Sequence, residues 1–114
     1  MKLLTKQIIQ QLQKNPYGSH DGEGLNAPLI VKFFNPCGAG TWLITEGDEL
    51  ENGDWLLFGL CHITDAEWGS VLLSELQEYK GPWGLGIERD MYAKGTVRDN
   101  IKNLIPAAEL EALA

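Results

Sequence analysis

The 114-residue sequence has only two cysteines, no long apolar run and few basic side chains, and each shortage excludes a class of protein. Cys37 lies in a Pro-Cys-Gly turn and Cys61 in an apolar run, and this single pair matches no zinc or redox motif. No apolar stretch approaches the roughly 20 residues of a membrane span. Polar residues also interrupt the N-terminal segment, where a signal peptide would be apolar. We therefore expect two reduced thiols in a cytoplasmic protein that has no membrane partner.

The charge balance is strongly acidic, with nine Lys and Arg residues against sixteen Asp and Glu residues and a net charge of -7. This charge opposes non-specific attraction to phosphate backbones and favours a basic or neutral partner. Positive charge exceeds negative charge in one region, which contains Arg89, Lys94, Arg98 and Lys102. A duplex-DNA binder is therefore disfavoured, while a single-stranded nucleic acid could still bind that region.

Length and composition favour one compact α+β domain over residues 1–114. A chain of this length buries roughly two-thirds of its unfolded surface, so it needs neither a disulfide nor a structural metal. Runs of strands followed by helical segments predict a small, mostly antiparallel sheet. We expect N-terminal, central short and C-terminal helices to pack on one face of that sheet.

The first half of the chain predicts one helix, one loop and three strands. Apolar residues at helical spacing indicate a helix over residues 4–14, which Thr5 caps and which ends before Asn15-Pro16. The next segment, residues 17–28, is rich in Gly, Asp, Ser and Asn and predicts a loop. Three apolar, β-prone runs predict an antiparallel sheet, at residues 29–34, 41–45 and 55–63.

Two sites in the second half have the spacing of a capping box, in which a hydroxyl and a carboxylate or amide three residues later satisfy the helix N-terminus. Thr64 with Glu67 is the first, although Gly69 limits it to about one turn of helix. Ser74 with Gln77 is the second, and it predicts a short helix.

The remaining segments predict short strands and a terminal helix. Residues 71–73 can form a short strand, and residues 86–92 can return to the sheet after Gly81-Pro82 ends the preceding helix. The apolar spacing of the tail predicts a terminal helix that restarts at Pro106, since proline suits the first helical turn.

The segment between the second and third predicted strands is acidic throughout. Asn52-Gly53 predicts a tight turn. No basic residue accompanies the five carboxylates of this segment, which are Glu46, Asp48, Glu49, Glu51 and Asp54. We expect the segment to face water, either as a solvated hairpin loop or as a surface that imitates nucleic-acid phosphates and binds a basic protein.

Six strings along the chain resemble the DUF2958 family of small bacterial proteins, which are found mainly on plasmids, integrative elements and phages. They are LLTK at Leu3, VKFFNP at Val31, GTWLITE at Gly40, FGLC at Phe58, LSEL at Leu73 and GPWGLGIERDMY at Gly81. The resemblance, over residues 3 to 95, implies a protein of a mobile element. Automated names of some members suggest a single-stranded DNA endonuclease. The chain departs from the family pattern at His62, where members usually have an acidic residue, and in the tail beyond Ala93.

Glu88 and Asp90 are the sharpest candidates for catalysis. Two residues apart on a strand, they would point the same way. Together with Glu46 or Asp54 they could hold Mg²⁺ for phosphodiester cleavage. The alternative is a structural ion network in which the same carboxylates pair with basic side chains.

Lys32 and Arg89 would provide the positive charges of such a network. Lys32 lies between Val31 and Phe33 in an apolar run, where an ammonium group must reach the rim or meet a carboxylate. We expect it to pair with Glu88 or Glu46. A catalytic lysine with a depressed pKa is the less favoured interpretation.

The two histidines and two cysteines could also carry chemistry. His20 and His62 both precede acidic residues and could meet at a metal, but we expect them to be solvated. Cys37 or Cys61 could act as a nucleophile beside a histidine, although no sequence feature predicts a lowered thiol pKa.

Three aromatic residues surround the glycine-rich string of residues 81–86. The string lacks the lysine of a phosphate-binding P-loop, and turn geometry explains its glycines. Trp83, Tyr79 and Tyr92 could present their rings for base stacking near Arg89. We favour the other interpretation, in which these rings close the core.

The charge pattern, together with what the resemblance to the DUF2958 family implies, leads us to expect a non-enzymatic accessory protein of a mobile element that binds a protein or nucleoprotein partner and needs no cofactor. A counter-defence inhibitor with a DNA-mimicking acidic surface is one form of this function. The expected binding residues are Glu46, Asp48, Glu49, Glu51, Asp54, Trp83 and Arg89. The alternative is a Mg²⁺-dependent endonuclease on single-stranded DNA, with Glu88, Asp90 and Glu46 as its acidic residues.

Overall fold

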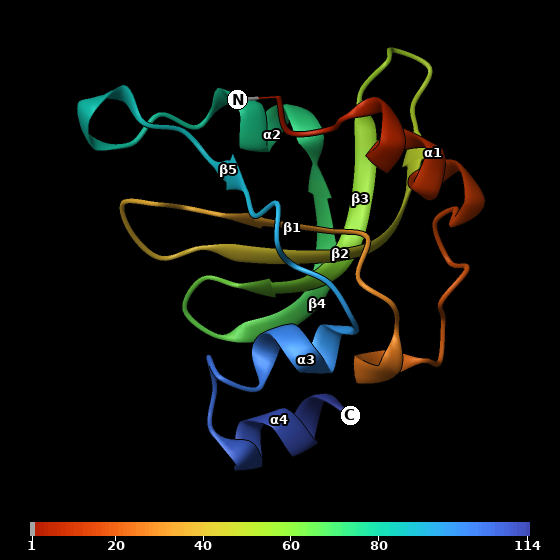
Figure 1. Ribbon diagram of the computed structural model, residues 1–114, viewed down its shortest axis with the longest axis vertical. Helices are drawn as coiled ribbons and strands as arrows, with labels where there is room; N and C mark the ends of the chain where they lie inside the picture. Colours follow the sequence, from red (N-terminus) through yellow and green to blue (C-terminus); the bar gives the residue numbers. More distant parts are fainter. Residues whose placement is uncertain (1) are drawn as a thin grey trace.

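The computed structural model describes residues 2–114, which form a five-stranded antiparallel sheet with helices, an α+β fold (Figure 1). The elements are α1 (Lys6–Lys14), β1 (Val31–Phe34), β2 (Thr41–Glu49), β3 (Trp55–His62), β4 (Ala66–Leu72), α2 (Leu73–Glu78), β5 (Glu88–Arg89), α3 (Val97–Ile101) and α4 (Ala107–Leu113). Short 3-10 turns lie at Gly24–Asn26 and Pro82–Gly84. Within residues 2–114, no helix has both the length and the apolar character to cross a bilayer.

The strands lie in the order β4-β3-β2-β1-β5, and every neighbouring pair is antiparallel. The first four strands form a meander, and the chain then returns to add β5 beside β1. The prediction that the three central runs are antiparallel neighbours is confirmed. The final strand is shorter than predicted, because only Glu88–Arg89 of residues 86–92 pairs with β1.

Helices cover both faces of the sheet, so the expectation of a single covered face is wrong. Neighbouring residues of a strand point to opposite faces, and Leu43 and Ile44 of β2 enter different apolar cores. Ile44 packs in the core that contains side chains from α1 and α2. Leu43 packs in the core that contains Leu25 and side chains from α3. The two helical layers lie on either side of the sheet in Figure 1.

The N-terminal helix forms as predicted. Thr5 is its N-cap, and its side-chain oxygen accepts a hydrogen bond of 3.2 Å from the Ile8 N–H. Leu12 is fully buried against the sheet, and the helix ends at Lys14, before Asn15 and Pro16.

The predicted helical turn at Thr64–Glu67 is wrong, because this segment opens strand β4. Ala66–Leu72 pairs with β3 along its whole length, for example Glu67 with Cys61 and Leu72 with Leu56. A local capping interaction contributes about 1 kcal/mol. The backbone hydrogen bonds and side-chain contacts of seven paired residues outweigh it.

The C-terminal region contains two helices where one was predicted. Pro106 is the N-cap of α4, as its place in the sequence suggested. The earlier helix, α3, starts at a capping box that was not predicted. In this box the Thr96 N–H donates to Asp99 Oδ2 at 3.0 Å, and the Asp99 N–H donates to Thr96 Oγ1 at 3.3 Å.

Candidate functional site

Glu46 lies inside the protein, so the prediction that the whole acidic segment faces water is wrong for this residue. The pairing of β2 with β3 shifts between Ile44 and Glu46, and this bulge turns the carboxylate inward. Glu46 is 1% exposed. Its two oxygens accept hydrogen bonds from the Gly18 N–H and, at 3.3 Å, from the Thr45 hydroxyl. Glu46 therefore ties the loop after α1 to the sheet and is not a surface ligand.

Asp54 also has an internal role, as the cap of α2. Its Oδ2 accepts a 2.6 Å hydrogen bond from the Ser74 hydroxyl, and its Oδ1 accepts bonds from the N–H groups of Ser74 and Trp55. The hydrogen bond from the Ser74 side chain is the main reason why the pKa of Asp54 lies below the ordinary aspartate value. The predicted pairing of Ser74 with Gln77 is wrong. Ser74 lies inside the helix, and the Glu75 carboxylate accepts from the Leu72 N–H at its start.

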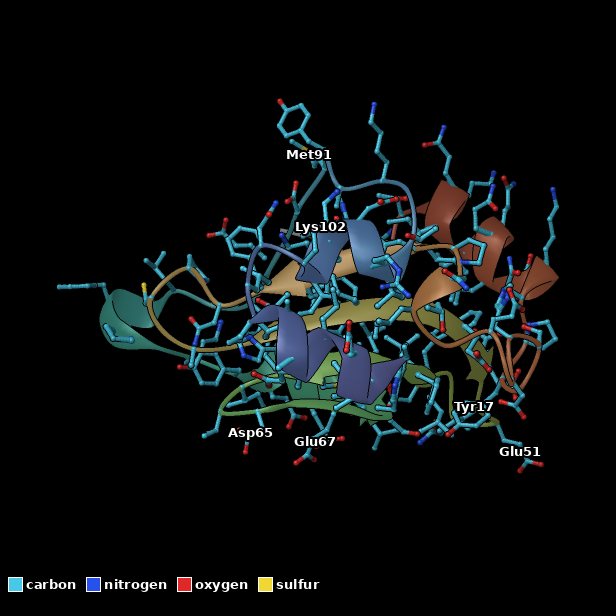
Figure 2. All side chains as sticks on the ribbon, turned by 90° about the horizontal axis from the view of Figure 1, so that it is seen from below. Tyr17, Glu51, Asp65, Glu67, Met91 and Lys102 are labelled. Carbon is cyan, nitrogen blue, oxygen red and sulfur yellow. The ribbon has the colours of Figure 1, made fainter. Side chains whose placement is uncertain are left out.

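Apart from Glu46 and Asp54, the acidic side chains of residues 33–79 reach the surface. Residues 33–79 contain nine Asp and Glu residues and not one Lys or Arg, and we call this segment the acidic half. Seven of its carboxylates are exposed, namely Asp48, Glu49, Glu51, Asp65, Glu67, Glu75 and Glu78. Figure 2 shows Glu51, Asp65 and Glu67 along one margin of the molecule, with Met91 at the opposite margin. Carboxylates from the β2–β3 turn and from β4 therefore share one side of the molecule.

The structure does not bring Glu88 and Asp90 together with Glu46. Asp90 Oδ2 lies 3.6 Å from Lys32 Nζ, so the partner of Lys32 is Asp90, and not Glu88 or Glu46 as predicted. Arg89 donates hydrogen bonds to the carbonyl oxygens of Lys2 and Leu3, which hold the N-terminal segment beside β5. Within residues 2–114, no three His, Cys, Asp or Glu side chains are grouped closely enough to hold a metal ion.

Within residues 2–114, the histidines and cysteines belong to no group of three side chains that could hold a metal ion. His20 Nδ1 lies 2.6 Å from Glu23 Oε2, and its Nε2 lies 2.7 Å from Asn15 Oδ1, so this ring orders the loop after α1. Both cysteines are free thiols. Burial, together with the nearby Glu67 carboxylate, raises the pKa of Cys61 to about 11, which makes it a poor nucleophile at neutral pH.

The aromatic residues near the glycine-rich string do not close the core, and that prediction is wrong. Trp83 is 91% exposed and Tyr92 is 85% exposed, while Tyr79 is partly covered and its hydroxyl accepts a hydrogen bond from the Asn35 side chain. Trp83 has φ of 58°, a left-handed conformation that is unfavourable for residues other than glycine. Met91, beside Tyr92, is 65% exposed. Large apolar side chains therefore stand free on the loops that flank β5.

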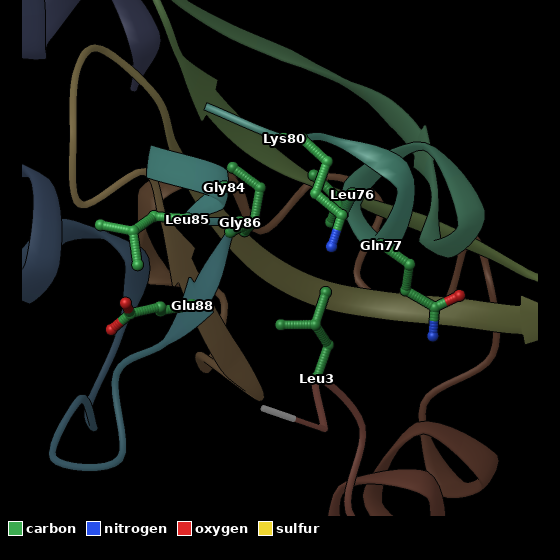
Figure 3. A pocket seen from close by; sticks show the side chains of 9 residues that line it. Leu3, Leu76, Gln77, Lys80, Gly84, Leu85, Gly86 and Glu88 are labelled. Carbon is green, nitrogen blue, oxygen red and sulfur yellow. The ribbon is translucent and has the colours of Figure 1, made fainter. Parts of the chain in front are cut away.

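A cavity of about 450 Å³ lies between α2 and the loop that leads to β5. Gln77 and Lys80 border it on the α2 side, Leu3 lies opposite, and Glu88 stands at its margin (Figure 3). A second cavity, of about 320 Å³, lies on the face of β4 to which Val71 points. Its lining is mostly apolar and includes Trp42, Ile63 and Tyr79, with Glu75 among its polar members.

The comparisons with known proteins identify the family but no activity. Neither the comparison with curated proteins nor the comparison with solved structures gave a significant match. A family model described as "Protein of unknown function (DUF2958)" matches residues 3–110, nearly the whole chain. The protein therefore belongs to the DUF2958 family.

Proposed function

We propose that this protein is a non-enzymatic accessory protein of a mobile element that binds a basic protein or nucleoprotein partner through its acidic half. The observation that carries the proposal is the absence of any Lys or Arg from residues 33–79, which contain nine acidic residues. Seven of these carboxylates are exposed. Their mutual repulsion destabilises the compact state slightly. A partner of opposite charge relieves that repulsion. The complementary charges also raise the rate of association and make the binding more specific.

The exposed tryptophan supports the same function. Trp83 is 91% exposed and sits in a strained backbone conformation at a loop tip. Tryptophan is enriched among the residues that dominate binding energy at protein interfaces. Backbone strain of this kind concentrates at functional sites. The ring would contribute apolar contact area, while the acidic half would orient the partner.

One form of this function is the inhibition of a basic nucleic-acid enzyme of the host. Exposed carboxylates along the β2–β3 turn and β4 would then take the place of DNA phosphates. The resemblance to proteins of plasmids, integrative elements and phages is what suggests this setting. Competition would identify it, because added DNA should then displace the protein from its partner.

Affinity capture from a lysate of the bacterial host, with mass spectrometry, tests the main proposal. The test variant carries Asp48→Asn, Glu49→Gln and Glu51→Gln. The matched control carries the same change in charge outside the acidic half, as Asp21→Asn, Glu109→Gln and Glu111→Gln. We expect wild type and control to recover the same basic protein in a salt-sensitive manner, and the test variant to lose it. Equal recovery by all three proteins would contradict the proposal.

A second candidate function is the binding and cleavage of single-stranded DNA. The observation that favours it is the exposure of Trp83 and Tyr92, with Tyr92 two positions before Lys94 in the segment that also contains Arg98 and Lys102, since stacking rings and positive charge together suit single strands. Labelled single-stranded DNA with Mg²⁺ or Mn²⁺ tests it. Cleavage that is lost in a Glu88→Ala/Asp90→Ala double variant would favour the endonuclease over the binding protein.

A further inference from the structure

We propose that the open edge of β4 (Ala66–Leu72) accepts an extended, basic segment of the partner as an additional strand. This inference rests on the proposed binding function and states how the partner is held. It requires three features, which are an unpaired strand edge, a charge that selects the incoming segment, and space for its side chains.

The edge of β4 is open along seven residues. The strand lies at one end of the sheet order, and within residues 2–114 no strand pairs with its outer side. Its pairing with β3 is regular, without a bulge, and it contains no proline. The opposite end of the sheet is the two-residue strand β5, which is too short to serve as a template.

The alternation of the ladder indicates which backbone groups face outward. The Leu72 N–H bonds to the Glu75 carboxylate at 3.0 Å instead of to β3. Because ladder hydrogen bonds alternate along an antiparallel pair, Trp68 and Ser70 must also direct their N–H and C=O groups to the open side. These groups form the template onto which a partner strand would add.

Charge selects the occupant. Asp65 and Glu67 point away from the body of the molecule at this edge (Figure 2), and Glu75 follows at the start of α2. Charged side chains on an edge strand can also serve only to prevent aggregation. They would do so here by repelling a second copy of the chain, whose own edge carries the same carboxylates. A segment with Lys or Arg beside these carboxylates meets no such repulsion and forms ion pairs with them.

The sheet face beside β4 has space for the apolar side chains of an added strand. Side chains of a strand alternate between faces, and Val71 lines the apolar cavity of about 320 Å³. Two residues earlier on the same face, a Cβ placed at Gly69 would have no neighbour within 4 Å. In strand addition the main-chain bonds supply affinity and such pockets supply specificity. The expected occupant therefore carries apolar side chains facing this cavity and basic ones near Glu67.

A peptide titration followed by NMR tests the proposal on the intact protein. The probe is a synthetic seven-residue peptide, the length of β4, with Val at positions 2 and 4, Lys at position 6 and Thr elsewhere, so that an antiparallel arrangement places these side chains on the face of Val71, Gly69 and Glu67. The comparison peptide is N-methylated at alternate residues, which keeps its charge but removes main-chain donors. We expect hydrogen exchange at the Trp68 and Ser70 amides to slow on binding, and the methylated peptide to bind at least about tenfold more weakly.

Two protein variants complete the design. Glu67→Lys reverses the charge at the edge and should weaken binding of the unmodified peptide, while Glu111→Lys makes the same change on α4 and should affect it less. Equal affinity for both peptides, with no slowing at Trp68 and Ser70, overturns strand addition while leaving charge-driven partner binding intact. Failure of the unmodified peptide to bind at about 1 mM also overturns it. Failure of the proposed function would be a separate result, namely equal capture of the partner by the wild type and by the variant that lacks three carboxylates of the acidic half.

Discussion

Asp54 reaches across 20 positions of sequence to cap the helix that contains Ser74, with its Oδ2 only 2.6 Å from the Ser74 hydroxyl oxygen. The same carboxylate accepts the N–H groups of Ser74 and Trp55. It thereby joins the turn between β2 and β3 to the first turn of α2, where a negative charge is also favoured by the helix dipole.

Asp54 should make stability depend on pH in the acidic range. Its hydrogen bonds, above all the one from the Ser74 side chain, hold its pKa below that of the unfolded chain. The stabilisation is therefore complete above the ordinary aspartate value of about 4 and is lost as the pH falls through the lower folded pKa. In Asp54→Asn we expect a smaller loss of stability on acidification, measured as urea midpoints between about pH 6 and pH 2.

Two controls make this expectation specific. Ser74→Ala removes the largest cause of the lowered pKa and should reduce the pH dependence in the same direction. Asp99 has a pKa lowered by its own hydrogen bonds to Thr96, so Asp99→Asn should remove a separate part of the pH dependence of stability. An unchanged pH profile in Asp54→Asn would contradict the assignment.

Glu46→Ala should release the loop after α1 from the sheet. The change leaves the Gly18 N–H without its acceptor and opens a buried space, which together should reduce the free energy of unfolding by about 1–3 kcal/mol. Hydrogen exchange at Gly18 should rise. Glu46→Gln keeps an acceptor in place and should lose less stability, and Glu51→Ala, at an exposed site on the β2–β3 turn, serves as the comparison. Equal exchange at Gly18 in Glu46→Ala and wild type would refute the anchoring role.

Trp83→Gly should leave the protein as stable as before, or more stable by up to about 1 kcal/mol. The side chain makes little contact, and glycine relieves the left-handed conformation. Trp55→Ala, at a residue only 5% exposed, should lower the free energy of unfolding by about 3–5 kcal/mol. Denaturant unfolding measures both. A large loss in Trp83→Gly would mean that the ring has a structural role and is not held for a partner.

Gly59→Ala should damage the sheet while Gly69→Ala should not, although the two glycines lie directly opposite each other on β3 and β4. A Cβ at Gly59 would lie 1.8 Å from the Leu43 carbonyl oxygen, so β2 and β3 would have to separate. We expect a loss of at least about 1–3 kcal/mol for Gly59→Ala. Gly69→Ala should stay within about 0.5 kcal/mol of wild type. Similar unfolding midpoints for the two variants would contradict the close approach.

Local patterns in the sequence were enough to predict α1, its Thr5 cap and the three central strands. Helix caps and alternating apolar residues act over a few positions, so they can be recognised without knowing the rest of the fold. The same local reasoning failed at residues 64–67, where pairing with β3 outweighed a capping signal. It also failed for Ser74, whose true partner is Asp54.

For the candidate site, too, some features could be predicted from the sequence and others only from the tertiary structure. The absence of basic residues from the acidic half is a property of the sequence alone, and so is the excess of carboxylates there. Which carboxylates remain available was decided only by tertiary structure, because a bulge buries Glu46 and a helix start recruits Asp54. The exposure of Trp83 was likewise decided in three dimensions, since an aromatic ring gives no local signal of whether a core lies within its reach.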